Sequence, residues 1–204
     1  MPELTEFAAT ALRPEEDYDG VAFRDLDLSD QQGTNARFLD CEMSRCDLSR
    51  TVLSRSRWSD CRLEQVRGVG VDLSEATLLD VSLTGARLGA LAAYGSSWRR
   101  VRVRGGKVDF LNLRGATLRE VVFEDCVLVE PDLAGATLAS VSFRGCTLVE
   151  PELGGAAFTA VDLSGAHLRE PRGLASLRGA TISRLQLLEL ADSLAAQLGI
   201  TVAE

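Results

Sequence analysis

The stretch VDLSGAHLRE at residues 161–170 divides into two five-residue units, each with leucine in third place, and PDLAGATLAS at 131–140 divides in the same way. Counting every fifth residue from Phe23 to Leu168 gives thirty positions, of which twenty-seven hold Leu, Phe, Met, Trp or Val. The exceptions are Gly33, Gly68 and Ala93. A period of five fits neither the helical period of 3.6 residues nor the alternation of a flat strand. The pattern predicts a chain that turns a corner every five residues. Each counted position i and the mostly small residue at i−2 face inward, and the other three face out.

A second period, of twenty residues, sets the number of sides. Glu-Pro recurs at Glu130-Pro131, Glu150-Pro151 and Glu170-Pro171. Residues twenty apart are therefore expected to be stacked neighbours, so that each coil has four sides of five residues. We number the sides one to four by their first residues in the first coil, Val21, Leu26, Gln31 and Ala36. At about 4.8 Å between stacked strands, the thirty units form seven and a half coils and a rod of roughly 36 Å.

These units carry a resemblance to a known family. VDLSGAHLRE, PDLAGATLAS and NLRGATLREVVFEDC (residues 112–126) resemble the A(D/N)LXX units of the pentapeptide-repeat family. The resemblance covers residues 21–170 and implies an all-β solenoid, namely a right-handed quadrilateral β-helix. The handedness comes from the family, because the spacing indicates only the four sides.

The C-terminal segment, residues 171–204, is predicted to cap the open end of the coil. Ser183 followed by Gln186 is typical of a capping box, and Gly199 suits the residue after a helix, so we expect an α-helix at 184–198. Its apolar residues exceed what one buried face needs. We therefore predict that the helix also joins a second copy of the chain, through Leu187, Leu190, Leu194 and Leu198. The alternative is that it only caps.

The N-terminal segment, residues 1–20, is predicted to be a short cap on the other end. Leu4, Phe7, Ala8 and Leu12 have helical spacing, and Pro14 ends the run. The repeat between the two caps, residues 21–170, forms one domain.

Charge is segregated along the chain. Residues 1–34 carry a net −7, residues 35–119 a net +6 and residues 120–204 a net −7. The repeat stacks one set of carboxylates at the corner between sides two and three, and we call it the acidic ridge: Glu130, Asp132, Glu150, Glu152 and Glu170. A second set, the basic patch, is expected at the opposite corner: Arg99, Arg100, Arg102, Arg104 and Lys107. The ridge is either a partner-binding surface or a solvated face that aids solubility.

The sequence offers no chemistry of catalysis. The five cysteines all fall at inward i−2 positions in no metal-ligand spacing, so we expect free buried thiols in a reducing cytoplasm. His167 is outward with no nucleophile placed beside it, and a convex rod lacks the pocket that catalysis needs. No apolar run is long enough for a membrane span, and the start of the chain does not resemble a signal peptide. We expect no catalytic residue, cofactor or metal site, and no enzyme.

The leading hypothesis on function is a nucleic-acid mimic. The chain resembles the mycobacterial and plasmid-borne pentapeptide proteins that protect DNA gyrase and topoisomerase IV from quinolones. Those proteins are dimers, joined through C-terminal helices, whose acidic rods occupy the DNA-binding saddle of the enzyme. Residues 120–170 carry a net −7 over roughly 12 Å, or about one charge per 1.7 Å, which is close to duplex DNA.

Two features of this chain differ from those proteins. The middle of the rod is basic, and the unbroken repeat lacks the loops of the plasmid-borne proteins, so the loop-free mycobacterial type is more similar. The alternative hypothesis is a protein-interaction scaffold with an unrelated partner. A third is nucleic-acid binding by the basic patch, which is disfavoured because Trp58 and Trp98 are inward and cannot stack on bases.

Overall fold

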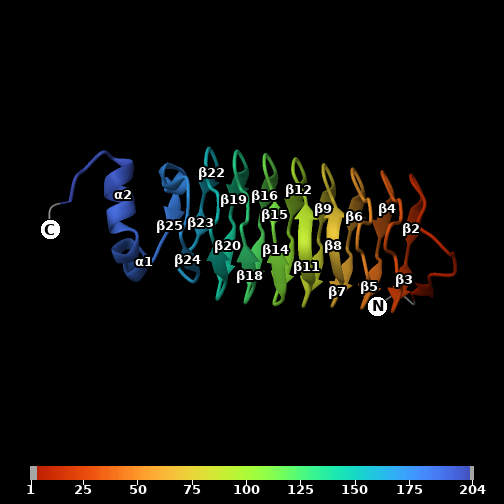
Figure 1. Cartoon of the computed structure of the whole chain (residues 1–204). Coiled ribbons are helices and arrows are strands. Elements are labelled where there is room, and N and C mark those ends of the chain that lie inside the picture. The colour runs from red at the N-terminus through yellow and green to blue at the C-terminus, as the bar shows by residue number, and fades with distance from the viewer. Residues whose placement is uncertain (1–3, 203–204) are drawn as a thin grey trace.

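The computed structural model, which describes residues 4–202, is a four-sided parallel β-solenoid followed by two short helices. Figure 1 shows the coils stacked along one axis, with the N-terminus towards one end and the helices at the other. Side one is a ten-stranded parallel sheet of β1 (Thr5–Glu6), β3 (Val21–Arg24), β5 (Glu42–Ser44), β7 (Arg62–Glu64), β10 (Ser82–Thr84), β13 (Arg102–Arg104), β17 (Val122–Glu124), β20 (Ser142–Arg144), β23 (Val161–Asp162) and β25 (Ala180–Thr181).

The other sides are stacked in the same way. Side four contains β2 (Asp17–Asp19), β4 (Arg37–Leu39), β6 (Arg57–Ser59), β9 (Thr77–Leu79), β12 (Ser97–Arg99), β16 (Thr117–Arg119), β19 (Thr137–Ala139) and β22 (Ala157–Thr159). Side two contains β8 (Arg67–Asp72), β11 (Arg87–Ala92), β14 (Lys107–Asp109), β18 (Val127–Val129), β21 (Thr147–Val149) and β24 (His167–Arg169). The strands β8 and β11 continue onto side three, where β15 (Leu111–Asn112) and isolated bridges complete the ladder. The predicted all-β solenoid with four sides is confirmed.

Partners in these ladders lie twenty residues apart through the body of the rod. Val122, for example, pairs with Arg102 on one side and Ser142 on the other. The spacing shortens at the ends, where Thr5 pairs with Val21 and Val161 pairs with Ala180. The parallel ladders therefore continue beyond residues 21–170 in both directions.

Every corner is built in the same way. Nearly every fifth residue has a positive φ, as at Glu130 (φ 48°) and Glu150 (φ 50°). This conformation turns the amide of the corner residue along the rod axis, so that Glu130 N donates to Val149 O of the next coil at 2.8 Å. Two residues later, Asp132 N donates to Leu111 O of the previous coil at 2.8 Å. The corner amides thus contribute hydrogen bonds between coils, alongside those of the strand residues.

The core is a set of columns of inward side chains, as the five-residue period predicts. Leu78, Leu118 and Leu138 are all buried. Aromatic rings stack in the columns, with ring centroids 3.9 Å apart for Phe38 and Trp58 and 4.8 Å apart for Phe123 and Phe143. All five cysteines are free and buried, as predicted from their inward positions.

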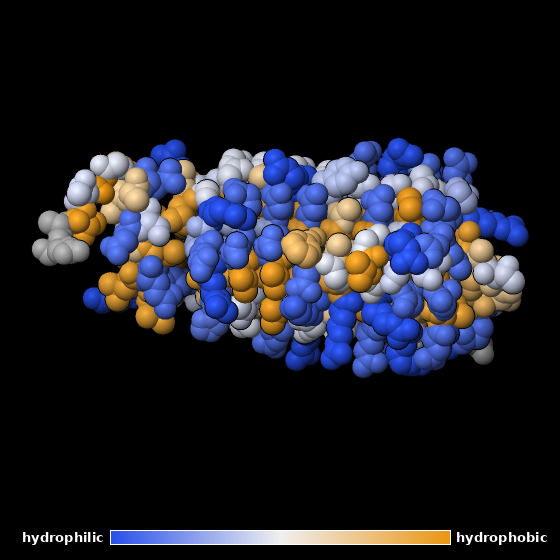
Figure 2. Space-filling view, in the orientation of Figure 1, coloured by the Kyte–Doolittle hydropathy of each residue, from blue (hydrophilic) through white to orange (hydrophobic). Residues whose placement is uncertain are grey.

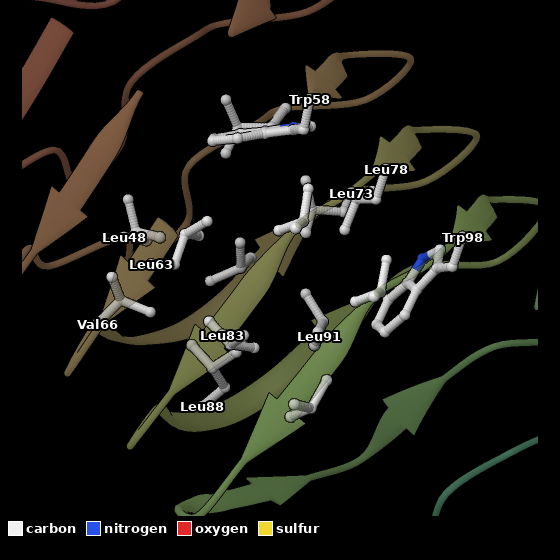
Figure 3. A pocket seen from close by; sticks show the side chains of 15 residues that line it. Leu48, Trp58, Leu63, Val66, Leu73, Leu78, Leu83, Leu88, Leu91 and Trp98 are labelled. Carbon is white, nitrogen blue, oxygen red and sulfur yellow. The ribbon is translucent and has the colours of Figure 1, made fainter. Parts of the chain in front are cut away.

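One column is imperfectly filled. Leu78 lies between Trp58 and Trp98 in successive coils, and the core around it holds an apolar cavity of about 40 Å³ (Figure 3). The indole Nε1 of Trp58 donates to Ser56 Oγ at 2.8 Å. The buried Nε1 of Trp98 has no partner among the described residues.

The helical spacing of Leu4, Phe7, Ala8 and Leu12 in the predicted N-terminal cap does not produce a helix. Residues 5–6 form β1, which pairs with β3, and the part of the chain described before residue 21 holds no helix. The apolar residues there fill the end of the coil instead. Phe7 packs on Phe23 with ring centroids 4.6 Å apart, and Leu12 is buried over Gly33. Residues 1–3 of the predicted cap, like 203–204 of the C-terminal one, lie outside the described residues.

The C-terminal end follows the prediction in part. After η1 (Leu174–Leu177), the capping box of Ser183 and Gln186 opens α1 (Arg184–Glu189), and α2 (Ala191–Gln197) follows. The expected single helix is broken at Leu190, which is buried in the core. No helix within residues 4–202 is long and apolar enough to cross a membrane.

Gln186 closes the last coil. The coil ends there, so the carbonyl of Ala166 has no further strand to accept from, while the carbonyl of Leu163 accepts from Ala166 N at 2.9 Å within its own turn. The Nε2 of Gln186 donates to both, at 2.7 and 2.6 Å. The side chain is itself buried, so these carbonyls have little access to water.

We expect Gln186→Ala to lower the free energy of unfolding by about 1–2 kcal/mol, because it leaves the buried carbonyl of Ala166 without a donor and removes one of the two hydrogen bonds to Leu163 O. The matched control is Gln197→Ala on exposed α2, which should change stability by less than about 0.5 kcal/mol. Urea unfolding followed by circular dichroism measures both. Equal midpoints for the two variants would contradict this role of Gln186.

Candidate functional site

The acidic ridge is built by corner residues that stack on one another. Glu130, Glu150 and Glu170 each end side two of successive coils with φ between 48° and 50°. Pro131 and Pro151, which follow two of them, are buried. The backbone thus fixes one outward carboxylate per coil, at rungs about 4.8 Å apart. The three glutamates form no ion pair with residues 4–202 and accept none of the side-chain hydrogen bonds found there.

The other two predicted ridge residues are already engaged. Asp132 pairs with Arg114 at 2.9 Å and accepts from the N–H of Ala134 at 2.9 Å. Glu152 lies 3.6 Å from Arg172 and accepts from the N–H of Gly154 at 2.7 Å. Both carboxylates stabilise the turn that follows them. The unpaired charge of the ridge therefore rests on the three glutamates.

Corners elsewhere on the rod stack opposite charges. Arg50 donates to both carboxylate oxygens of Asp30, each at 2.6 Å, and Arg45 does the same to Asp25. These hydrogen bonds hold the pKa of Asp25 and Asp30 below the usual range. Each arginine lies twenty residues after its aspartate, in the stacked position that a second glutamate occupies on the ridge.

The basic patch does not form one basic corner. Arg100 donates to both oxygens of Asp80, at 2.7 and 2.5 Å, and Arg104 lies 3.6 Å from Glu124. Lys107 opens β14 on side two, one corner further round, and pairs with Asp109 at 2.8 Å. Arg99 on β12 and Arg102 on β13 do remain close to Arg100 in the chain. The predicted patch is therefore spread over three sides and largely neutralised.

The sequence pattern also missed acids at that corner. Sequence positions twenty apart place Asp40, Asp60, Asp80 and Glu120 in one column with Arg100. Asp60 and Glu120 raise the pKa of Arg100, after the larger effect of its hydrogen bond to Asp80. The net charge of +6 for residues 35–119 does not reveal this column, because that sum includes outward residues from all four sides. The rod is consequently not basic opposite the ridge.

A surface hollow of about 300 Å³ runs along the ridge. Glu130 and Glu150 line it from the corner, and Asp132, Glu152 and Arg172 line it from side three. Phe110 borders the hollow, and its side chain is 56% exposed. Phe110 was not predicted as a site residue, although it is the one aromatic residue among the outward positions that end each five-residue unit.

Other reactive side chains lie apart from the ridge. Within the described chain, no group of three or more His, Cys, Asp and Glu side chains is arranged to hold a metal ion. His167 is exposed on β24, and burial raises the pKa of the Cys46 thiol.

Comparison with known proteins agrees with this architecture. The profile described as pentapeptide repeats matches the chain in eight copies, over residues 46–89 and 110–145. These residues match the pentapeptide-repeat family, and the four-sided solenoid of the chain is the fold of such repeats. No curated protein matches it significantly.

Solved structures similar to the chain include two pentapeptide-repeat proteins. One is trypsin-treated QnrB1, a plasmid-mediated fluoroquinolone resistance protein, with 19% identity over 92% of this chain and 100% of that one, at a TM-score of 0.43. Another is HetL, involved in heterocyst differentiation regulation in the cyanobacterium Nostoc, with 18% identity over 87% of this chain and 94% of that one, at a TM-score of 0.39. Neither likeness assigns a partner to this chain.

The stacking of like charges on the ridge generates a prediction. Glu150→Arg should place a guanidinium over Glu130, as Arg50 lies over Asp30, and remove the repulsion between neighbouring rungs. We expect the Tm to rise by about 2–4 °C at low salt, and the gain to vanish at about 1 M salt. Ala160→Arg is the control, since its corner position follows Ser140 rather than an acid. Differential scanning calorimetry would contradict the prediction if both variants behaved alike.

Proposed function

We propose that this chain is a non-enzymatic cytoplasmic binding protein whose acidic ridge mimics the phosphate charges of DNA. Its partner is a basic groove of a type II topoisomerase, DNA gyrase or topoisomerase IV, and binding modulates the enzyme or protects it from quinolone-type inhibitors. The resemblance to the quinolone-protection members of the family motivates the choice of partner. The observation that carries the proposal is the column of unpaired Glu130, Glu150 and Glu170.

The magnitude of the charge supports a partial mimic. Residues 120–170 carry a net −7, and counting Arg114 and Arg172, which pair with Asp132 and Glu152, lowers this to −5. Over roughly 12 Å this is about one charge per 2.4 Å, against about 1.7 Å along duplex DNA. The density remains high enough to attract a basic groove, and the attraction falls with salt.

Assembly into a homodimer lengthens the acidic surface in this proposal. Leu190, which was predicted to contact a second copy, is buried within its own chain and is not available to one. Leu194 packs against the core. Leu187 and Leu198 are 50% and 76% exposed. The end of the rod exposes further apolar side chains on the same segment: Leu185, Leu188, Ile200 and Val202. We propose that this outer face joins two chains.

Reversing the ridge tests the proposed partner. In the triple variant Glu130→Lys, Glu150→Lys and Glu170→Lys, we expect the effect on gyrase supercoiling, with and without a quinolone, to fall by about one to two orders of magnitude in potency. The fold should persist, because all three side chains point outward. Reversal of Arg99 and Arg102 to Glu is the matched control and should weaken nothing. Wild-type protein that leaves both enzymes unaffected would sink the topoisomerase proposal.

The dimer has its own test. Leu187→Glu combined with Leu198→Glu should give a monomer by multi-angle light scattering, because two charges would enter the contact. The Tm of the coil should change little, since both side chains are exposed in one chain. Gln197→Glu controls for added charge on α2 and should remain dimeric. A wild-type chain that is monomeric at high concentration would refute the dimer.

A second candidate function is a scaffold for an unrelated protein partner. It is favoured by the ion pairs of Asp132 and Glu152, which make the ridge less uniform than a phosphate backbone. Under this alternative, gyrase is unaffected while the ridge variant still loses its natural partner.

A further inference from the structure

Phe110 occupies a conformation that its residue type disfavours. Its φ is 51°, in the left-handed region, where a bulky side chain is a clear outlier and the local cost is appreciable. Among residues 4–202, the other residues with a positive φ are polar or charged side chains, glycines and one alanine, Ala160. The ring is also 56% exposed, so burial in this chain does not offset the strain. An exposed and strained aromatic residue indicates a binding role.

The surroundings of Phe110 define what it binds. Phe110 lies one coil before Glu130 in the same corner column, and the hollow continues past it along Glu150. On side three, Asn112, Asp132, Glu152 and Arg172 follow one another through bridged positions in successive coils. The hollow therefore has an aromatic ring at one end, carboxylates along its length and an arginine at the other end.

The outer face of side two adds apolar surface beside this hollow. Figure 2 shows hydrophobic residues gathered on the middle of the rod, among hydrophilic neighbours. Val127 is 38% exposed, and Val129 and Val149 are partly exposed partners in neighbouring strands. A ligand seated at the ridge thus meets both charge and apolar surface, which a phosphate-like surface alone does not offer.

We propose that the hollow binds an arginine-bearing helix of a partner protein, with one guanidinium on the face of Phe110. This inference deepens the proposed function, on which it rests, by naming the chemistry that the ridge recognises. A guanidinium stacks on an aromatic face and pairs with carboxylates, which are the two features that meet here. Nucleic acid is disfavoured as the ligand, because its phosphates are repelled by Glu130 and Glu150.

The spacing of the rungs favours a helix over an extended segment. Carboxylates stacked along the ridge are about 4.8 Å apart. Residues at i and i+3 or i+4 of a helix are separated by about 4.5–6.0 Å along its axis, whereas alternate residues of a strand are about 6.6–6.8 Å apart. A helix lying along the rod therefore presents one arginine per coil over the two or three coils before Arg172. The adjacent valines face the apolar side of the same helix.

The test uses a synthetic probe and the full-length protein. The probe is a fluorescein-labelled helical peptide of alanine with arginine at every third or fourth position, and its pair carries lysine instead. Fluorescence anisotropy at low salt should show tighter binding of the arginine peptide, because arginine stacks better on aromatic rings. A labelled DNA duplex should not bind.

Phe110→Asn separates recognition from stability. Asparagine tolerates the left-handed conformation, as Asn35 does at φ 59° in this chain, so the Tm should rise by about 2–4 °C. Affinity for the arginine peptide should nevertheless fall by about three- to tenfold, and the preference over lysine should disappear. Tyr94→Ala, which removes another exposed aromatic residue from side three, is the matched control and should leave affinity unchanged.

Three outcomes overturn the inference: Phe110→Asn with wild-type affinity, equal binding of the arginine and lysine peptides by the wild type, or binding of duplex DNA in place of the peptide. None of these arms contains a topoisomerase. If the wild-type protein has no effect on gyrase but still binds the arginine peptide through Phe110, only the proposed partner is refuted.

Discussion

The left-handed residue that ends nearly every unit is the constraint on which this structure depends. A positive φ in an L-amino acid is locally unfavourable, yet it recurs along the whole rod. It is compensated because the corner amide then points along the axis and donates to the next coil, as Glu150 N does to Arg169 O at 2.8 Å. Ring stacking and burial of the inward columns add to this bond. The four-sided cross-section and the twenty-residue register both follow from the corner.

The same constraint explains where function can reside. Inward positions are fixed by packing, whereas the outward residues of each unit vary with little effect on the fold. Because register stacks equivalent residues in every coil, a single choice of side chain is repeated along a column. Arg50 over Asp30 neutralises one stretch of a column, and Glu150 over Glu130 accumulates charge further along it. A surface of defined charge thus arises without any loop or pocket wall.

The sequence predicted the repeating part of the molecule well, because one five-residue rule governs inward burial and column membership. The four sides, the buried thiols, the capping box and the positive φ of Gly199 all follow from it or from local capping rules. The ends were harder to predict, since the rule lapses there. Leu190 turned inward where helical periodicity assigned it to a second chain, and Phe7 and Leu12 fill the coil end rather than a helix.

For the outer surface, the sequence predicted which residues share a column but not which side chains contact one another. Ridge residues were assigned correctly to one corner, but the turn-stabilising bonds of Asp132 and Glu152 depend on side-chain reach that spacing does not reveal. Counting charges by region likewise concealed the pairing of Arg100 with Asp80. In the sequence, Phe110 is only the one aromatic residue among the outward positions that end each unit, and its left-handed conformation comes from the structure. Its place beside the hollow depends on the stacking of the coils, which composition does not reveal.

The direction of the inter-coil hydrogen bonds has a mechanical consequence. They run along the rod axis, and the two ends of the chain lie towards opposite ends of the rod (Figure 1). Tension applied between the ends therefore loads the coils in series, so each ladder opens like a zipper rather than shearing as a unit. Releasing one coil frees about twenty residues, which extend to roughly 65 Å where they had spanned about 5 Å. The stacked core of such a rod resists bending. Pulling on its ends unfolds it one coil at a time, starting from the end with the less stable cap.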